Sequence, residues 1–72
     1  MIARVEFKTI LAEFLNENNL TQSDFANIIG VDHQLVGDWL KGRAKPGYDS
    51  LYAMAKAFDV TADYFLGLKD EY

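Results

Sequence analysis

The sequence predicts an all-α fold of five short helices. Apolar residues recur at three- and four-residue spacing, as on one face of a helix, and no segment alternates polar and apolar residues as a strand does. Capping residues and glycines divide the chain at short intervals. Half of the 72 residues are hydrophobic and a quarter are charged, which is typical of a single globular domain, here expected over residues 1–72.

The first two helices are predicted from apolar periodicity and from caps. One is expected from Val5 to Asn18, with five apolar side chains on one face: Phe7, Ile10, Leu11, Phe14 and Leu15. The next begins after Thr21, whose hydroxyl can accept a hydrogen bond from a free backbone N–H of the first turn. It ends at Gly30, because glycine readily takes the left-handed conformation that closes a helix.

The third helix is expected from His33 to Lys41, with Asp32 as its N-cap and Gly42 at its end. Only residues 30–32 then separate it from the helix before it. The sequence therefore predicts two short helices joined by a tight turn.

The remaining chain supplies a loop and two more helices. Residues 43–47 contain two basic residues, a proline and a glycine, which is typical of an exposed loop. A fourth helix is expected at Tyr48–Phe58, and a fifth, capped by Thr61, at Ala62–Leu66.

The composition argues against several kinds of function. The chain has no cysteine, which excludes disulfides and thiolate zinc sites, and its single histidine cannot supply paired metal ligands. We therefore expect no metal and no cofactor, and no small-molecule ligand is evident from the sequence. An enzyme is disfavoured, because there is no phosphate-binding glycine loop and the histidine lacks an obvious catalytic partner. Charges near the N-terminus and the lack of a long apolar stretch argue against a signal peptide or membrane span, so we expect a cytoplasmic protein.

A set of residues spread over most of the chain has a characteristic order and spacing. It comprises Leu20-Thr21-Gln22, Phe25-Ala26, Ile29-Gly30-Val31, Val36, Trp39, Gly42, Lys45-Pro46, Leu51, Ala55-Lys56-Ala57 and Asp63-Tyr64-Phe65-Leu66-Gly67. In this order the residues resemble the phage repressor and Cro family, the lambda repressor-like or XRE-type helix-turn-helix DNA-binding domains. The resemblance implies a helix-turn-helix unit over about residues 20–41, whose second helix enters the major groove of double-stranded DNA.

The predicted third helix has an apolar side and a polar side. At about 100° per residue, the polar side carries His33, Gln34, Gly37, Asp38 and Lys41. The resemblance implies that the positions of His33, Gln34 and Asp38 reach base edges and that Gly37 lies close to the groove. Gln34 is the strongest candidate, because a glutamine can form two hydrogen bonds with adenine.

Four residues are expected to contact the DNA backbone: Gln22, Lys41, Arg43 and Lys45. Gln22 opens the second helix, where free N–H groups and the helix dipole favour a phosphate, and the resemblance implies a clamp there. Residues 33–45 hold three basic side chains and one aspartate, a net charge of +2 in a chain of formal charge −4. Because the local field steers docking, the acidic total does not exclude DNA binding.

Five positions depart from the family pattern. Relatives often carry an arginine and a glutamate as an ion pair at the positions of Leu15 and Leu40, and an apolar pair can replace it without leaving a buried charge. Leu35 stands where relatives often have serine or threonine, and it could touch a thymine methyl group. Gly37 is unfavourable inside a helix, which suggests that something, DNA being one candidate, approaches its backbone closely.

Asp38 is the fifth departure, because it places a negative charge on the reading face. An idle acid beside phosphates weakens binding to every sequence. We expect Asp38 to accept a hydrogen bond from cytosine N4, while pairing with a nearby cation or simple tolerance remain the alternatives.

These features predict a small transcriptional regulator that binds double-stranded DNA sequence-specifically, as repressors of phages and mobile elements do. The alternative is a protein-interaction module on the same fold, antitoxin-like or anti-repressor, with weak or no DNA binding. Leu35, Asp38 and the acidic net charge support this alternative. A homodimer on a pseudo-palindromic operator is expected, because one short helix reads few base pairs. The apolar C-terminal end is the candidate dimer interface: Tyr64, Phe65, Leu66, Leu68 and Tyr72.

Overall fold

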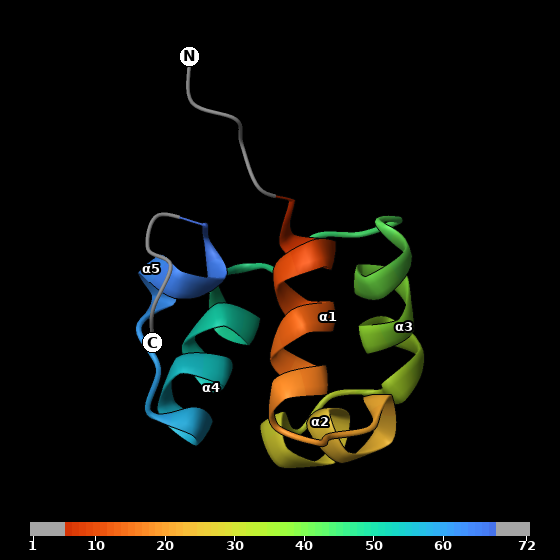
Figure 1. The fold of residues 1–72 in the computed structure, drawn as a ribbon, viewed down its shortest axis with the longest axis horizontal. Helices are drawn as coiled ribbons and strands as arrows, with labels where there is room; N and C mark the ends of the chain where they lie inside the picture. Colours follow the sequence, from red (N-terminus) through yellow and green to blue (C-terminus); the bar gives the residue numbers. More distant parts are fainter. Residues whose placement is uncertain (1–5, 68–72) are drawn as a thin grey trace.

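Residues 6–67 are described by the structure, a computed structural model. They form five helices and no strand, which confirms the predicted all-α class. The helices are α1 (Phe7–Glu17), α2 (Gln22–Ile29), α3 (His33–Lys41), α4 (Tyr48–Phe58) and α5 (Ala62–Phe65). Helix α1 runs between α3 on one side and α4 and α5 on the other, and α2 crosses beneath α1 and α3 (Figure 1). None of the helices in this described range is long and apolar enough to cross a membrane.

Helix α2 and the turn that joins it to α3 form through the capping residues expected from the sequence. The Thr21 hydroxyl accepts a hydrogen bond from Asp24 N–H at 3.0 Å, and the Asp24 carboxylate accepts one from Thr21 N–H at 3.1 Å. Gly30 ends α2 in the left-handed region, with φ of 79°. Asp32 then caps α3 by accepting from Gln34 N–H at 2.9 Å. Both ends of the turn are therefore fixed by local chemistry.

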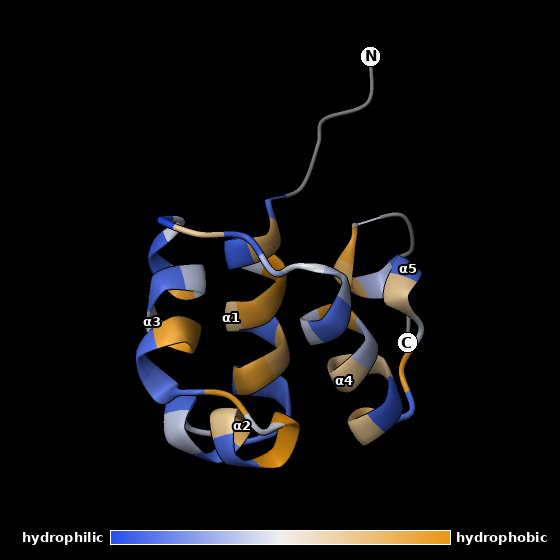
Figure 2. Cartoon of the chain, turned by 180° about the vertical axis from the view of Figure 1, so that it is seen from behind, coloured by the Kyte–Doolittle hydropathy of each residue, from blue (hydrophilic) through white to orange (hydrophobic). Residues whose placement is uncertain are grey.

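The core is apolar and draws on all five helices. No polar or charged side chain among the described residues is buried in it. Helix α1 carries long hydrophobic stretches, whereas α3 is hydrophilic over most of its length (Figure 2). The buried side chains are Ile10, Leu11, Phe14, Leu15, Phe25, Ala26, Ile29, Val36, Trp39, Met54, Val60, Tyr64 and Phe65.

Aromatic contacts join the helices within this core. The rings of Phe25 on α2 and Phe58 on α4 stack 5.3 Å apart, with an angle of 7° between their planes. Phe14 on α1 lies edge-on to Phe58 at 5.1 Å. Trp39 on α3 is 1% exposed and lies edge-on to Phe7 on α1 at 6.0 Å. The contact between Trp39 and Phe7 holds α3 against α1 and helps to set the position of the outer face of α3.

The leucines that depart from the family pattern contribute to the core. Leu15 is buried, and Leu40 packs against the core from α3, as expected for an apolar replacement of an ion pair. Leu35 is also half-buried against the core. Its apolar side chain is therefore explained by packing within the chain.

The predicted dimer surface needs a correction. Tyr64 is 7% exposed and Phe65 is 1% exposed, because both side chains pack inside the chain with the rest of the core. They do not form a surface, so the sequence-based assignment of these two residues is wrong. Leu66 is 54% exposed, whereas Leu68 and Tyr72 lie outside the described residues.

Candidate nucleic-acid interface

The outer face of α3 and the start of α2 meet around one shallow, open depression. Seven of the eight residues that the sequence assigned to DNA line it: Gln22, His33, Gln34, Gly37, Asp38, Lys41 and Arg43. The residues come from α2, from α3 and from the loop after α3. Packing of the apolar side of α3 against α1 turns the opposite side outward and gathers these groups.

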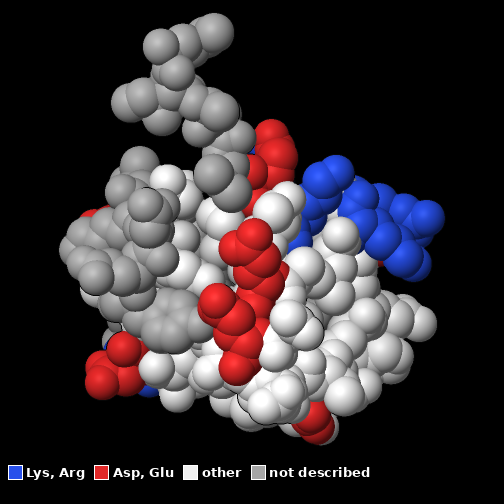
Figure 3. All heavy atoms as spheres, viewed as in Figure 1, with Lys and Arg blue, Asp and Glu red and all other residues white. Residues whose placement is uncertain are grey.

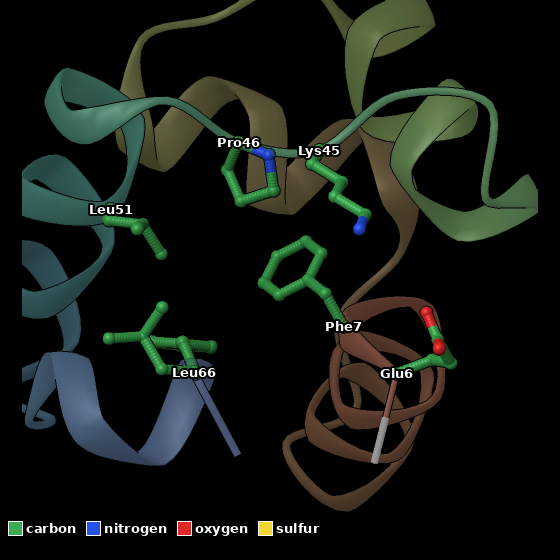
Figure 4. Close-up of a pocket in the computed structure, with 7 residues that line it drawn as sticks. Glu6, Phe7, Lys45, Pro46, Leu51 and Leu66 are labelled. Atoms are coloured by element: carbon green, nitrogen blue, oxygen red, sulfur yellow. The ribbon is translucent and has the colours of Figure 1, made fainter. Parts of the chain in front are cut away.

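Lys45 is the predicted contact that the structure does not bring to this depression. It lines a different pocket, of about 130 Å³, between the start of α1, the loop after α3 and the end of α5. Its side chain points toward Phe7 (Figure 4). Contact between Lys45 and DNA stays a prediction.

The base-reading candidates differ in what surrounds them. His33 and Gln34 are exposed in the first turn of α3. The His33 imidazole Nδ1 lies 3.6 Å from the Asp32 carboxylate, whereas the Gln34 side chain has no hydrogen-bond partner within residues 6–67. The Gln34 amide can therefore bind a base edge without first giving up an internal partner.

The Gln22 side chain bridges the two helices of the unit. Its Nε2 donates a hydrogen bond to the backbone carbonyl oxygen of His33 at 2.7 Å. Gly37 is buried beside it, and a Cβ built on Gly37 would lie 2.8 Å from that same nitrogen. The group that approaches the Gly37 backbone in the free protein is thus the Gln22 amide.

Asp38 has a cation within reach. Its Oδ1 lies 4.0 Å from Nη1 of Arg43, across the end of α3. The two side chains are 45% and 68% exposed, so the pair is a weak one worth at most about 1 kcal/mol. Arg43 can therefore exchange Asp38 for another anion at little cost.

A basic patch lies over the end of α3, and sequence reasoning missed one of its members. The missed residue is Lys8 on α1, whose Cδ lies 3.1 Å and whose Nζ lies 3.6 Å from the Cβ position at Gly42. Its ammonium is therefore beside Gly42, the residue that ends α3 and stands between Lys41 and Arg43 in the sequence. Lys8 precedes α3 by more than twenty residues in the sequence. Its place beside Gly42 therefore becomes visible only once α1 and α3 are packed together.

The charges on the surface are separated. In Figure 3 the Lys and Arg side chains form a patch at the end of α3, whereas Asp and Glu side chains run along the α1 side of the same view. Glu13 and Glu17 are exposed on α1, away from the depression. An approaching polyanion is thus attracted to one end of α3 and repelled along the acidic part of α1.

Comparison with known proteins agrees with this arrangement of helices. A sequence model of the family described as Helix-turn-helix matches residues 11–65. The chain therefore belongs to this helix-turn-helix family, which confirms the family predicted from the sequence.

One curated relative is similar in sequence, and two solved structures are similar in fold. The uncharacterized HTH-type transcriptional regulator YobD of Bacillus subtilis (strain 168) is 33% identical over 61 residues, which cover 85% of this chain and 54% of the relative. The chain thus spans about half of that relative's length.

The two structures share the fold. A transcriptional regulator from Listeria innocua superposes with a TM-score of 0.79 and 24% identity, covering 99% of this chain and 65% of the other. The restriction-modification controller protein C.AhdI from Aeromonas hydrophila superposes with a TM-score of 0.77 and 24% identity, covering 85% of this chain and 92% of the other.

Proposed function

We propose that this chain is a DNA-binding transcriptional regulator that reads double-stranded DNA through the outer face of α3. The gathering of Gln22, the polar side of α3 and Arg43 around one open depression carries this proposal. His33, Gln34 and Asp38 face base edges, while Gln22, Lys41 and Arg43 contact phosphates. The name of the curated relative, an HTH-type transcriptional regulator, supports the same function.

Lys8 extends the backbone contacts to α1. Its stem lies against Gly42, so the ammonium stays at the end of α3 where the strand of phosphates beside the groove would pass. A lysine there attracts phosphate as a point charge and carries no sequence information.

The alternative, a protein-interaction module that has lost DNA binding, has less support than the sequence suggested. Leu35 was one of its arguments, and the structure packs this side chain against the core. Asp38 was another, and Arg43 lies opposite it. The net charge of −4 remains, but Lys8, Lys41 and Arg43 form a basic patch at the end of α3, beside the proposed site.

The test begins with selection of bound duplexes from a random pool, followed by affinity measurements on the preferred site and on scrambled DNA. Gln34→Ala should cost about 1 to 3 kcal/mol on the preferred site and relax the preference at one base pair. Arg43→Ala and Lys8→Gln should weaken binding to all duplexes alike and reduce its salt dependence.

Lys56→Gln serves as the matched control, because Lys56 is exposed on α4 and does not line the depression. It should leave both affinities unchanged. If no duplex is enriched, or if Gln34→Ala and Arg43→Ala both leave DNA affinity intact, the proposed site is wrong. Such a result would support the protein-interaction alternative.

A further inference from the structure

The hydrogen bond from Gln22 acts at the end of α3 that carries the base-reading candidates. Its acceptor, the carbonyl oxygen of His33, belongs to the first residue of α3. The side chains of His33 and Gln34 leave the backbone at this same turn. A donor anchored on α2 therefore holds the part of α3 whose position determines which bases can be reached.

Gly37 stands one helical turn after His33. In an α-helix the carbonyl of a residue points toward the residue four positions later, so a group that reaches the His33 carbonyl from outside passes close to position 37. A Cβ at Gly37 would lie 2.8 Å from Nε2 of Gln22, 3.5 Å from its Cδ and 3.6 Å from its Oε1. The first distance is too short for an unbonded carbon and nitrogen, so the amide would have to move.

We propose that Gln22 is a positioning residue for α3 and that Gly37 is the glycine that makes room for it. Together they form an amide latch, defined as the Gln22 side chain, the His33 carbonyl and the bare backbone at Gly37. The inference rests on the proposed function, because the latch serves base reading. It explains a glycine in the middle of α3, where alanine has the higher helix propensity.

A methyl group at position 37 should open the latch without unfolding the chain. The atom in its way is the end of a flexible side chain, which can swing outward. Loss of one hydrogen bond is opposed by the better helix propensity of alanine, so the thermal midpoint of Gly37→Ala should stay close to that of the wild type. The start of α3 would then be less firmly held, and selectivity for the preferred duplex should fall.

A double-mutant cycle on the full chain separates this proposal from direct contact between Gly37 and DNA. Wild type, Gln22→Ala, Gly37→Ala and the double variant are compared on the preferred and scrambled duplexes at one salt concentration. Each single substitution should lower the ratio of the two affinities by about tenfold, a typical coupling for residues in contact. In the double variant Gly37→Ala should cost nothing further, because the latch is already absent.

The opposite result overturns the proposal. If Gly37→Ala has the same cost with and without Gln22, the methyl group collides with DNA and no latch is involved. Gly47→Ala is the matched control, since no atom lies within 4 Å of a Cβ at Gly47 and its φ of −83° suits alanine. It should leave the ratio unchanged.

A second measurement needs no DNA and keeps the two proposals apart. In NMR spectra of the free protein, the Gln22 side-chain amide should show slower solvent exchange than the unpartnered amide of Gln34, and this difference should vanish in Gly37→Ala. Unchanged Gln22 signals in that variant refute the latch. An intact latch in a protein that enriches no duplex would refute the proposed function alone.

Discussion

At the scale of single residues, the acidic side chain on the reading face is the least expected feature. The Asp38 carboxylate lies 4.0 Å from the Arg43 guanidinium in the free protein, so it pairs with a cation that is proposed to bind phosphate. On DNA, Arg43 can turn to a phosphate, which leaves Asp38 to find another partner. Cytosine N4 is a donor of the right kind in the major groove.

Asp38→Ala should therefore act in opposite directions on different duplexes. Affinity for scrambled DNA should rise by up to about fivefold, because a repulsive charge is removed and Arg43 is released. Affinity for the preferred site should fall by about 1 to 3 kcal/mol, and the preference at one position should disappear. Competition binding at one fixed salt concentration measures both effects. Equal strengthening on both duplexes would show that Asp38 reads no base.

The sequence alone predicted most residues of the candidate site, but it did not predict the contacts between residues on different helices. The helical spacing of about 100° per residue correctly placed Gln34 and Asp38 on the outer side of α3, because this geometry depends only on neighbouring residues. It could not show that Gln22 lies over Gly37 or that Lys8 lies against Gly42, since both depend on how separate helices cross. The same limit explains the error at Phe65, where periodicity predicts an apolar side chain but not what covers it.

At the scale of elements, the boundaries of α2 and α3 are the features that depend most on short-range chemistry. Predicted and observed ends of α3 agree, because a capping aspartate and a glycine mark them. The ends of α1 are less well marked: the Glu6 side chain makes no cap hydrogen bond, and the helix ends at Glu17, one residue before the predicted end.

The capping box of α2 should contribute measurably to stability. Thr21→Ala removes the hydroxyl that accepts from Asp24 N–H, and it should lower the free energy of unfolding by about 1 kcal/mol. Urea denaturation at neutral pH measures the change. Thr9→Ala is a suitable control, because Thr9 is exposed inside α1 and caps no helix. Equal effects of the two substitutions would mean that the cap adds nothing beyond a surface threonine.

The other half of the box gives a pH dependence. Two hydrogen bonds lower the pKa of Asp24. The larger effect comes from the Thr21 backbone N–H and the smaller one from the Thr21 side chain. A carboxylate with a lowered pKa in the folded state stabilises the fold above its unfolded pKa, and this contribution is lost as the pH falls through the folded value. Asp24→Asn should thus be less stable than wild type at neutral pH, and the gap should close below about pH 4. A gap that persists in acid would contradict the assignment.

At the scale of the whole molecule, the basic patch of one chain covers only the end of α3. We predict that two chains bind together to a pseudo-palindrome whose half-sites lie about 10 base pairs apart, because two-fold operators match two-fold proteins. Sedimentation of the protein with and without the selected duplex checks this stoichiometry. One chain per duplex at saturation would rule the prediction out. Since Tyr64 and Phe65 are buried, Leu66→Ser is the variant to examine for weakened association.

The burial of Trp39 gives the molecule an optical signal that is separate from DNA reading. It is the only tryptophan in the 72 residues, and it lies 1% exposed on the side of α3 opposite the depression. Its fluorescence emission should therefore resemble that of an indole in an apolar solvent, and the emission maximum should shift when the chain unfolds. Bound DNA cannot touch it, so the emission should stay constant during a titration with duplex. A shift of the emission on adding DNA would report that α3 moves against α1.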